Sequence, residues 1–293
     1  MLPTLDAYTP REIAHKIETL GVTKARSDTL SLLVLAVLAG AFIALGAMFF
    51  TVVVTRSALG FGVSRLVGGV AFSLGLILVV VGGAELFTGN NLVAMAWASR
   101  RITSAELLRN WGLVYVGNTL GALGTVLLVL VGDVAQFGDG AVRETALAIG
   151  RHKATLGVTE ALALGVLCNG LVCLAVWLAM GGRSVADKVL AIIFPITAFV
   201  TMGFEHSIAN LFFLSYALAL SGFGDAQLLA GSVRNLLVVT GGNILGGTVL
   251  VAGVYWVAYL RPGAGADAGA VHVPDTDGLR TNTQSPPSGP AWG

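Results

Sequence analysis

Charge is scarce in this sequence: Asp, Glu, Lys and Arg make up 11% of the 293 residues, against about 25% in typical soluble domains. Hydrophobic residues reach 55%, and the mean hydropathy is +0.83. This composition excludes an ordinary soluble protein and indicates an integral membrane protein. The net charge is only +1 and the longest basic run is the pair Arg100–Arg101, so we expect no nucleic-acid partner.

Cysteine is nearly absent as well. Cys168 and Cys173 stand in one apolar run, at a spacing that places them on different faces of a helix. That arrangement suits neither a disulfide nor a metal site, so we interpret both as packing residues. We also expect no signal peptide, because residues 1–29 are polar and have no small-residue cleavage site. We expect residues 1–29 to form a retained, partly helical N-terminal segment.

Long apolar runs fill the middle of the chain and predict an all-α membrane domain over residues 30–260. The second and fifth runs reach about 33 residues, which as straight helix would measure roughly 50 Å against a hydrocarbon core of about 30 Å. We therefore expect both to be broken or re-entrant. The six candidate spans cover residues 30–54, 66–98, 107–131, 161–180, 189–221 and 236–260.

Two motifs recur along the chain. The polar interruptions of the long runs, GGAELFTGNN from Gly82 and MGFEHSIANL from Met202, share the pattern G-x-E-x-x-x-x-N. The third and sixth runs open with RNWGLVYVGNTLG from Arg109 and RNLLVVTGGNILG from Arg234. The offsets of the two pairs are nearly equal, which indicates an internal duplication with halves at about 30–132 and 155–260.

Three spans in each half force the halves into opposite orientations, as in the inverted repeats that build transporters and channels. The fold class predicted is therefore an all-α membrane protein with six spans in a 3+3 inverted repeat. Lys and Arg are more numerous on the side of the N-terminus, the even-numbered loops and the tail, which places both termini in the cytoplasm. Residues 261–293 are rich in Pro, Gly, Ser and Asp, and we expect them to form a disordered tail.

The interruptions carry the candidate functional residues. Glu85 and Glu205 occupy the same place in each half, where a carboxylate could accept hydrogen bonds from backbone N–H groups freed by the break. A role in proton relay or ligand binding is the alternative for these two residues. Asn90 and Asn210, and likewise the duplicated Asn118 and Asn243, are expected to fix loops and helix contacts. The spacings Gly117-x-x-x-Gly121 and Gly242-x-x-x-Gly246 indicate close helix packing.

His206 differs from these residues because the first half has Leu86 in its place. Ionisable residues inside a membrane usually mark substrate or proton paths, and the proton of a histidine can move near neutral pH. We therefore interpret His206 as functional. The alternative is a buried neutral imidazole that is hydrogen-bonded to a neighbour such as Thr88 or Ser207.

These motifs resemble those of the formate/nitrite transporter family. GGAELFTGN and GFEHSIAN are similar to its two signatures, while LCNGLVCLAVWLA from Leu167, GRSVADK from Gly182 and YTPREIAHKIETLG from Tyr8 resemble its fourth helix, the loop that follows and its N-terminal helix. The resemblance implies a homopentamer of aquaporin-like protomers in the cell membrane. It also implies that each protomer has its own pore for small monovalent anions such as formate or nitrite.

The resemblance further implies roles for particular residues. His206 would stand mid-pore with Thr88 beside it, and Lys153 would lie near the extracytoplasmic mouth. Asn169 would line the pore. Hydrophobic constrictions would be formed by Phe72, Leu76, Leu86, Phe199 and Val172.

A bare anion crosses apolar rings only at a heavy desolvation cost. If a proton reached formate or nitrite through His206 or water, a neutral acid would cross and the cost would fall. An aquaporin-like channel for water or glycerol is the nearest alternative, although the sequence has no Asn-Pro-Ala triplet. The neighbours Glu205, His206 and Ser207 do not form a catalytic set on a helix, so we expect neither an enzyme nor a cofactor nor a metal.

Overall fold

The computed structural model describes residues 7–262, and these residues contain helices but no strand. The predicted disordered tail over 261–293 lies outside the described residues, except for Arg261 and Pro262. The α-helices are α1 (Pro10–Ala25), α2 (Thr29–Val54), α3 (Phe61–Gly82), α4 (Ala94–Ala98), α5 (Ser104–Val131), α6 (Ala141–Thr155), α7 (Val158–Gly181), α8 (Val185–Thr201), α9 (Ser207–Leu220), α10 (Ala226–Leu245) and α11 (Val254–Tyr259). Short 3₁₀ helices cover Gly89–Val93 and Val134–Gln136, and a π-helix over Gly246–Gly253 joins α10 to α11.

Five helices among the described residues are long and apolar enough to cross a membrane: α2, α3, α5, α7 and the continuous helix Ala226–Tyr259. Within each, the most apolar stretch is at most half buried by the rest of the chain. The remaining apolar surface therefore faces lipid or other subunits. The fifth predicted run, residues 189–221, is divided into α8 and α9, of 17 and 14 residues, and neither is long enough to count as a span by itself.

Both long runs are interrupted by a glycine in the left-handed region. Gly83 has φ 78° after α3, and Gly203 has φ 76° after α8. Glycine adopts this conformation without the steric cost that a Cβ brings. After Gly83 the chain is irregular until the 3₁₀ helix begins at Gly89, and after Gly203 it is irregular until α9 begins at Ser207.

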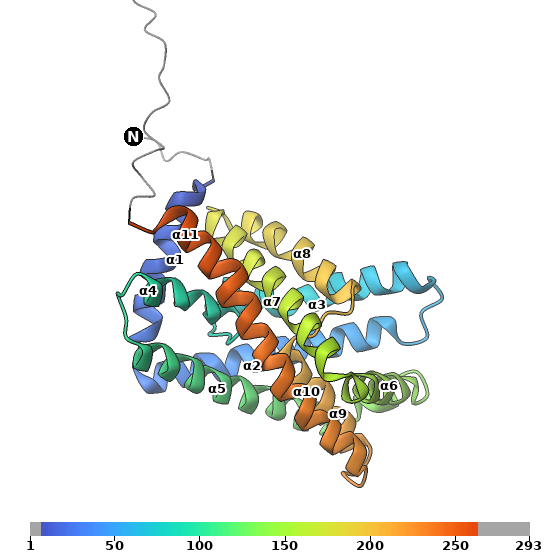
Figure 1. The fold of residues 1–293 in the computed structure, drawn as a ribbon. Coiled ribbons are helices and arrows are strands. Elements are labelled where there is room, and N and C mark those ends of the chain that lie inside the picture. Colours follow the sequence, from blue (N-terminus) through green and yellow to red (C-terminus); the bar gives the residue numbers. More distant parts are fainter. Residues whose placement is uncertain (1–6, 263–293) are drawn as a thin grey trace, which may run out of the picture. The chain divides into compact units, whose positions relative to one another are not determined.

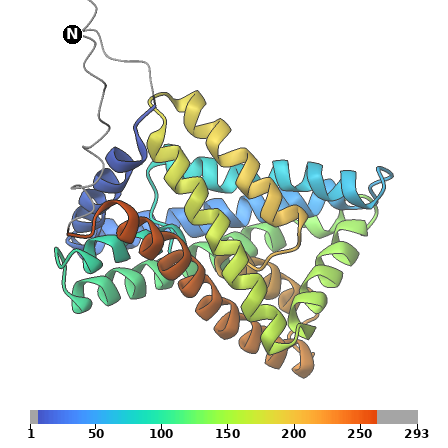
Figure 2. The same ribbon diagram turned by 45° about the horizontal axis from the view of Figure 1, so that its top comes forward.

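The helices pack in two similar groups. In the first group α2 packs against α3 and α5, and in the second α7 packs against α8 and α10. The groups meet where α8 crosses α3, shown in yellow and light blue in Figures 1 and 2. Small residues allow the close approach, because a Cβ built on Gly121 would lie 2.0 Å from the Val37 carbonyl oxygen and one on Gly246 would lie 2.1 Å from that of Val166. The packing role predicted for these glycines is confirmed.

Candidate functional site

Two asparagines attach the irregular loops to neighbouring helices. In the first half, the Asn118 Oδ1 accepts from the Phe87 amide at 2.9 Å, and its Nδ2 donates to the carbonyls of Ala36 and Glu85. In the second half, Asn243 repeats this pattern with the Ser207 amide at 2.8 Å and the carbonyls of Gly165 and Glu205. The expectation that glutamate carboxylates accept from the freed backbone N–H groups is wrong, since buried asparagine amides do so. An amide suits this task because it supplies both an acceptor and donors.

The two glutamates instead organise matching polar clusters. The Lys24 cluster consists of Lys24, Glu85, Asn90 and Asn110, and the Lys153 cluster consists of Lys153, Glu205, Asn210 and Asn235. In each cluster the lysine Nζ donates to the glutamate Oε1, at 2.7 Å in the first and 2.8 Å in the second. In each, an asparagine Nδ2 also donates to the glutamate Oε2, from Asn90 at 2.7 Å and from Asn210 at 2.6 Å.

The Lys24 cluster shows a correspondence that the predicted halves did not include. Lys24 lies in the last turn of α1, a helix assigned to the polar N-terminal segment, while Lys153 lies in the last turn of α6. A sequence signal for this match exists, because G-x-x-K-A occurs at Gly21–Ala25 and again at Gly150–Ala154. Both glycines face an alanine of the neighbouring helix, so the motif packs the lysine helix against its half.

The clusters differ in burial and in one hydrogen bond. The Lys24 and Glu85 side chains are 29% and 12% exposed, whereas those of Lys153 and Glu205 are 13% and 3% exposed. Lys24 also donates to the Asn90 Oδ1 at 3.1 Å. The equivalent Oδ1 of Asn210 is buried and has no hydrogen-bond partner among the described residues.

His206 lies between the two loops. Its Nδ1 accepts from the Ala209 amide at 3.0 Å, so the ring caps the N-terminus of α9, and its Nε2 lies 2.9 Å from the Thr88 Oγ1. A ring nitrogen that accepts from an amide carries no hydrogen, so the hydrogen of the neutral imidazole is assigned to Nε2 and points at Thr88. The Thr88 hydroxyl then keeps its own hydrogen free to donate. Both side chains are buried.

Aromatic and aliphatic side chains enclose this pair. The Phe72 and Phe199 rings meet edge to face with centroids 5.6 Å apart, and Phe199 stacks on the His206 ring at 5.9 Å. Leu76 lies one turn beyond Phe72 on α3, and Leu86 lies in the first loop. All four apolar residues are buried and belong to one hydrophobic cluster, which we call the apolar wall.

A cavity lies on each side of this wall. The Lys153 vestibule has a volume of about 520 Å³ and is lined by Phe72, Phe199, His206 and the Lys153 cluster residues Lys153, Glu205 and Asn210, among others. The Lys24 vestibule has a volume of about 240 Å³ and is lined by Leu76, Leu86, Lys24, Glu85 and Asn90, among others. The two cavities share no lining residue. On α3 the nearest lining residues of the two cavities are Phe72 and Leu76, which are one helical turn apart, a rise of roughly 6 Å.

Asn169 and Val172 lie in α7 and line neither vestibule. The Asn169 Nδ2 is within hydrogen-bond distance of the Thr88 carbonyl at 3.2 Å, the Asn91 Oδ1 at 2.8 Å and the Asn243 carbonyl at 2.7 Å. It therefore connects the loop that carries Thr88 to α10. Cys173 and Cys168 are free and buried, and residues 7–262 contain no group of His, Cys, Asp and Glu that could hold a metal ion.

An all-helical membrane domain with a cavity on either side of a thin barrier has the architecture of a membrane transport protein. The chain matches the family model for formate/nitrite transporters over residues 11–257. The formate channel FocA of Escherichia coli (strain K12) is 40% identical over 273 residues, which cover 87% of this chain and 96% of FocA. The uncharacterized transporter YrhG of Bacillus subtilis (strain 168) is 41% identical over 253 residues, which cover 85% and 93% of the two chains.

Solved structures agree with this match. A pentameric formate channel with formate bound has a TM-score of 0.71 at 38% identity, over 80% of this chain and 98% of that one. An FNT family ion channel has a TM-score of 0.76 at 32% identity, over 84% and 98%. The chain therefore belongs to the formate/nitrite transporter family, and it is a transport protein rather than an enzyme.

Proposed function

We propose that this protein conducts small monovalent anions of weak acids, with formate and nitrite as the first candidates, across the cell membrane. The observation that carries the proposal is the pair of lysine-bearing vestibules on either side of the contact between His206 and Thr88. The relatives described as formate channels support the choice of anion. The solved pentameric relative supports a homopentamer in which each protomer has its own pathway.

The proposed architecture is an aquaporin-like 3+3 inverted repeat of six spans, with both termini in the cytoplasm. Matching contacts of Asn118 and Asn243 and the matching lysine clusters support this symmetry. In this arrangement α3 with its following 3₁₀ helix and α4 forms one broken span, and α8 with α9 forms the other. The Lys153 vestibule then opens outside the cell and the Lys24 vestibule opens to the cytoplasm.

An anion entering the Lys153 vestibule meets short-range donors first. The ammonium of Lys153 can donate hydrogen bonds beyond the one that it gives to Glu205, since it has three hydrogens. The anion next meets Phe72 and Phe199, where the loss of hydration costs many kcal/mol for a full charge in idealised estimates. A weak acid avoids this cost because it can cross the apolar layer as the neutral molecule.

His206 assists this step in its neutral form. The Nε2 hydrogen is donated to the Thr88 Oγ1 at rest, which leaves the Thr88 hydroxyl hydrogen available for an anion, and the Nε2 hydrogen can turn to the anion once it arrives. A second ring proton would have to sit on Nδ1 against the Ala209 amide, and would break the cap of α9. We therefore assign proton delivery to water in the vestibule, with His206 holding the anion while it is protonated. Leu76 and Leu86 form the apolar exit toward the Lys24 vestibule.

Uptake by liposomes that contain the purified protein tests the proposal. Formate and nitrite are supplied separately at two external pH values, and water and glycerol fluxes are measured in the same vesicles. We expect uptake of at least one anion that rises as the external pH falls, because the neutral fraction of a weak acid grows about tenfold per pH unit above its pKa. Glycerol or water flux without anion uptake would replace this function by a neutral-solute channel.

A further inference from the structure

The two vestibules differ in net charge. In the Lys24 vestibule the charged lining residues are Lys24 and Glu85, which form an ion pair and cancel. In the Lys153 vestibule Lys153 and Glu205 cancel in the same way, but Arg65 lines the cavity as well. His152 and His206 are its other titratable lining residues, and both are uncharged when neutral. Arg65 is therefore the one full charge in either lining that no carboxylate balances.

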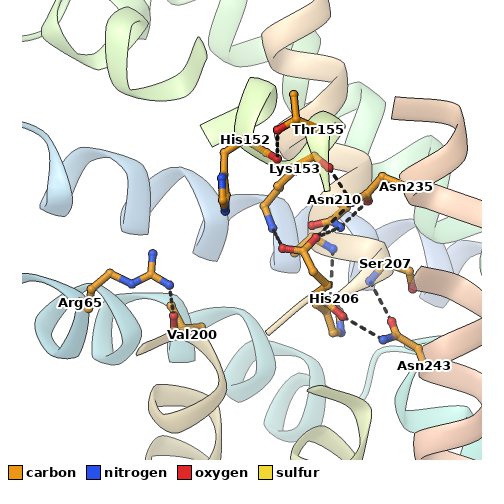
Figure 3. Close-up of polar contacts among 12 residues, drawn as sticks. Arg65, His152, Lys153, Thr155, Val200, His206, Ser207, Asn210, Asn235 and Asn243 are labelled. Atoms are coloured by element: carbon orange, nitrogen blue, oxygen red, sulfur yellow. Dashed lines mark hydrogen bonds and ion pairs between the residues drawn. The ribbon is translucent and has the colours of Figure 1, made fainter. Parts of the chain in front are cut away.

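Arg65 is held in place by backbone and aromatic contacts. It projects from α3 to the end of α8, where Nε donates to the Thr201 carbonyl at 3.3 Å and Nη2 donates to the Val200 carbonyl (Figure 3). The guanidinium also lies over the Phe50 ring, 5.5 Å from its centroid. Its Nη1 has no hydrogen-bond partner among residues 7–262, and no ion pair to Arg65 occurs within that range. The side chain is thus fixed while part of its donor capacity stays available.

The position of this charge matters because α8 ends at the vestibule. The last carbonyls of a helix carry a partial negative charge of about half an electron, and Val200 and Thr201, in the last turn of α8, belong to the vestibule lining. An anion would be repelled by that helix end. The Arg65 guanidinium adds a full positive charge at this helix end, so the net electrostatic potential there attracts an anion.

The second half has no such residue at the matching position. The repeat offset of 120 residues, taken from Glu85 and Glu205, places Val185 opposite Arg65. Val185 is apolar and exposed at the start of α8. The charge therefore distinguishes one side of the barrier from the other.

We propose that Arg65 forms an anion-binding subsite that concentrates small monovalent anions in the Lys153 vestibule, and that its charge sets the capture rate on that side. This inference rests on the proposed function, since it concerns the same pathway. Arg65 acts over a longer range than Lys153, whose charge Glu205 balances at 2.8 Å. Its contribution is therefore electrostatic steering, which depends on ionic strength.

The test measures initial anion uptake into liposomes as a function of anion concentration and of added inert salt. Arg65→Gln removes the charge but keeps an amide that can donate to the end of α8. At low salt we expect kcat/KM to fall about three- to tenfold, as one charge at vestibule distances in a mostly aqueous dielectric implies. Near 1 M salt, where the screening length is about 3 Å, the variant and the wild type should converge. Arg65→Lys keeps the charge and should retain most of the low-salt rate.

Two further variants make the result specific. Arg56→Gln removes a charge from the loop that precedes α3 but outside the vestibule lining, and should leave kcat/KM unchanged. Phe61→Glu leaves Arg65 in place and balances it, because Phe61 is 85% exposed and lies one turn before Arg65 on α3. Relative to Phe61→Gln, Phe61→Glu should lower the low-salt rate as Arg65→Gln does. If Arg65→Gln fails to assemble, the comparison of Phe61→Glu with Phe61→Gln still tests whether the charge of Arg65 sets the uptake rate.

The outcomes separate the two proposals. Wild-type vesicles that take up neither formate nor nitrite would overturn the proposed function, and the inference about Arg65 with it. Wild-type uptake that Arg65→Gln or Phe61→Glu leaves unaltered in rate and salt dependence would overturn only the inference. A loss in Arg65→Gln that persists undiminished at 1 M salt would show a purely structural role and would also overturn it.

Discussion

Removal of Lys153 should destabilise the protein much more than a change at a pore mouth would. Glu205 is only 3% exposed, and its carboxylate is bonded to the Lys153 Nζ at 2.8 Å. Lys153→Met leaves that carboxylate buried without a counter-charge, which costs about 3–5 kcal/mol when a buried pair is broken. At about 2–4 °C per kcal/mol, the melting temperature should fall by roughly 6–20 °C.

The double variant Lys153→Met/Glu205→Gln should recover most of this loss. A neutral glutamine needs no counter-charge, and its Oε1 can still accept the hydrogen bond that Asn210 donates at 2.6 Å. The symmetry-related pair supplies the matched control. Lys24→Met should cost about half as much, because Lys24 and Glu85 are 29% and 12% exposed and water replaces part of the lost interaction.

Thermal unfolding in detergent, followed by tryptophan fluorescence with size-exclusion chromatography for assembly, measures the three variants and the wild type. The reasoning is refuted if the melting temperature of Lys153→Met equals that of the wild type. It is also refuted if the double variant has no higher melting temperature than Lys153→Met alone. If Lys153→Met and Lys24→Met lowered the melting temperature equally, the argument that the more buried ion pair contributes more to stability would be refuted. Transport is best compared in the double variant, where stability no longer masks the effect of the missing ammonium.

Three other predictions concern His206, Gly246 and Glu12. His206→Asn should keep the cap on α9, since asparagine is a good N-cap residue, and should lower the rate of anion uptake in liposomes while its pH dependence stays, because the proposed proton comes from water; a flattened pH profile would show that the imidazole itself delivers the proton. Gly246→Ala should lower the melting temperature, because its Cβ would lie 2.1 Å from the Val166 carbonyl and overpacking costs about 1–3 kcal/mol, whereas Gly241→Ala in the same helix meets no atom within 4 Å and should not. The Thr9 amide lowers the pKa of Glu12, so this capping contribution is fully present above the ordinary glutamate pKa and is lost as the pH falls through the lowered one. The hydrogen-exchange protection factors at the start of α1, which are corrected for the intrinsic pH dependence of exchange, should therefore fall on acidification, and Glu12→Gln should remove that pH dependence.

Much of the fold could be predicted because the bilayer constrains element length. Runs of about 33 residues exceed the hydrocarbon thickness, and the interruptions at Gly83 and Gly203 follow from that excess. The duplicated asparagines were also visible as motifs. The hydrogen-bond partners of these asparagines could not be predicted. Which buried acceptor bonds to a backbone N–H freed by the break depends on side-chain geometry, and the spacing of residues in the sequence does not encode that geometry. Asn118 and Asn243 therefore accept the backbone N–H hydrogen bonds that we had expected the glutamates to accept.

Two members of the site, Lys24 and Arg65, were missed for different reasons. Lys24 belongs to α1, whose polar composition suggested a segment outside the repeat, and the short motif that it shares with Lys153 is weak without the fold. Arg65 stands at the start of an apolar run, where a basic residue ordinarily marks the membrane boundary. Only the meeting of α3 with the end of α8 brings it to the vestibule.

The thinness of the barrier has a consequence for the response to membrane voltage. In the proposed pathway water fills both cavities, so the transmembrane potential would fall mainly across the layer between Phe72 and Leu76, which are one helical turn apart, a rise of roughly 6 Å. An anion that crosses this layer with its charge moves through almost the whole field, at about 2.3 kcal/mol per 100 mV. A neutral acid crosses without electrical work. Vesicles clamped at different potentials with potassium and valinomycin therefore distinguish the two modes: voltage should change the flux steeply if the charge crosses, and hardly at all if the proton travels with the anion.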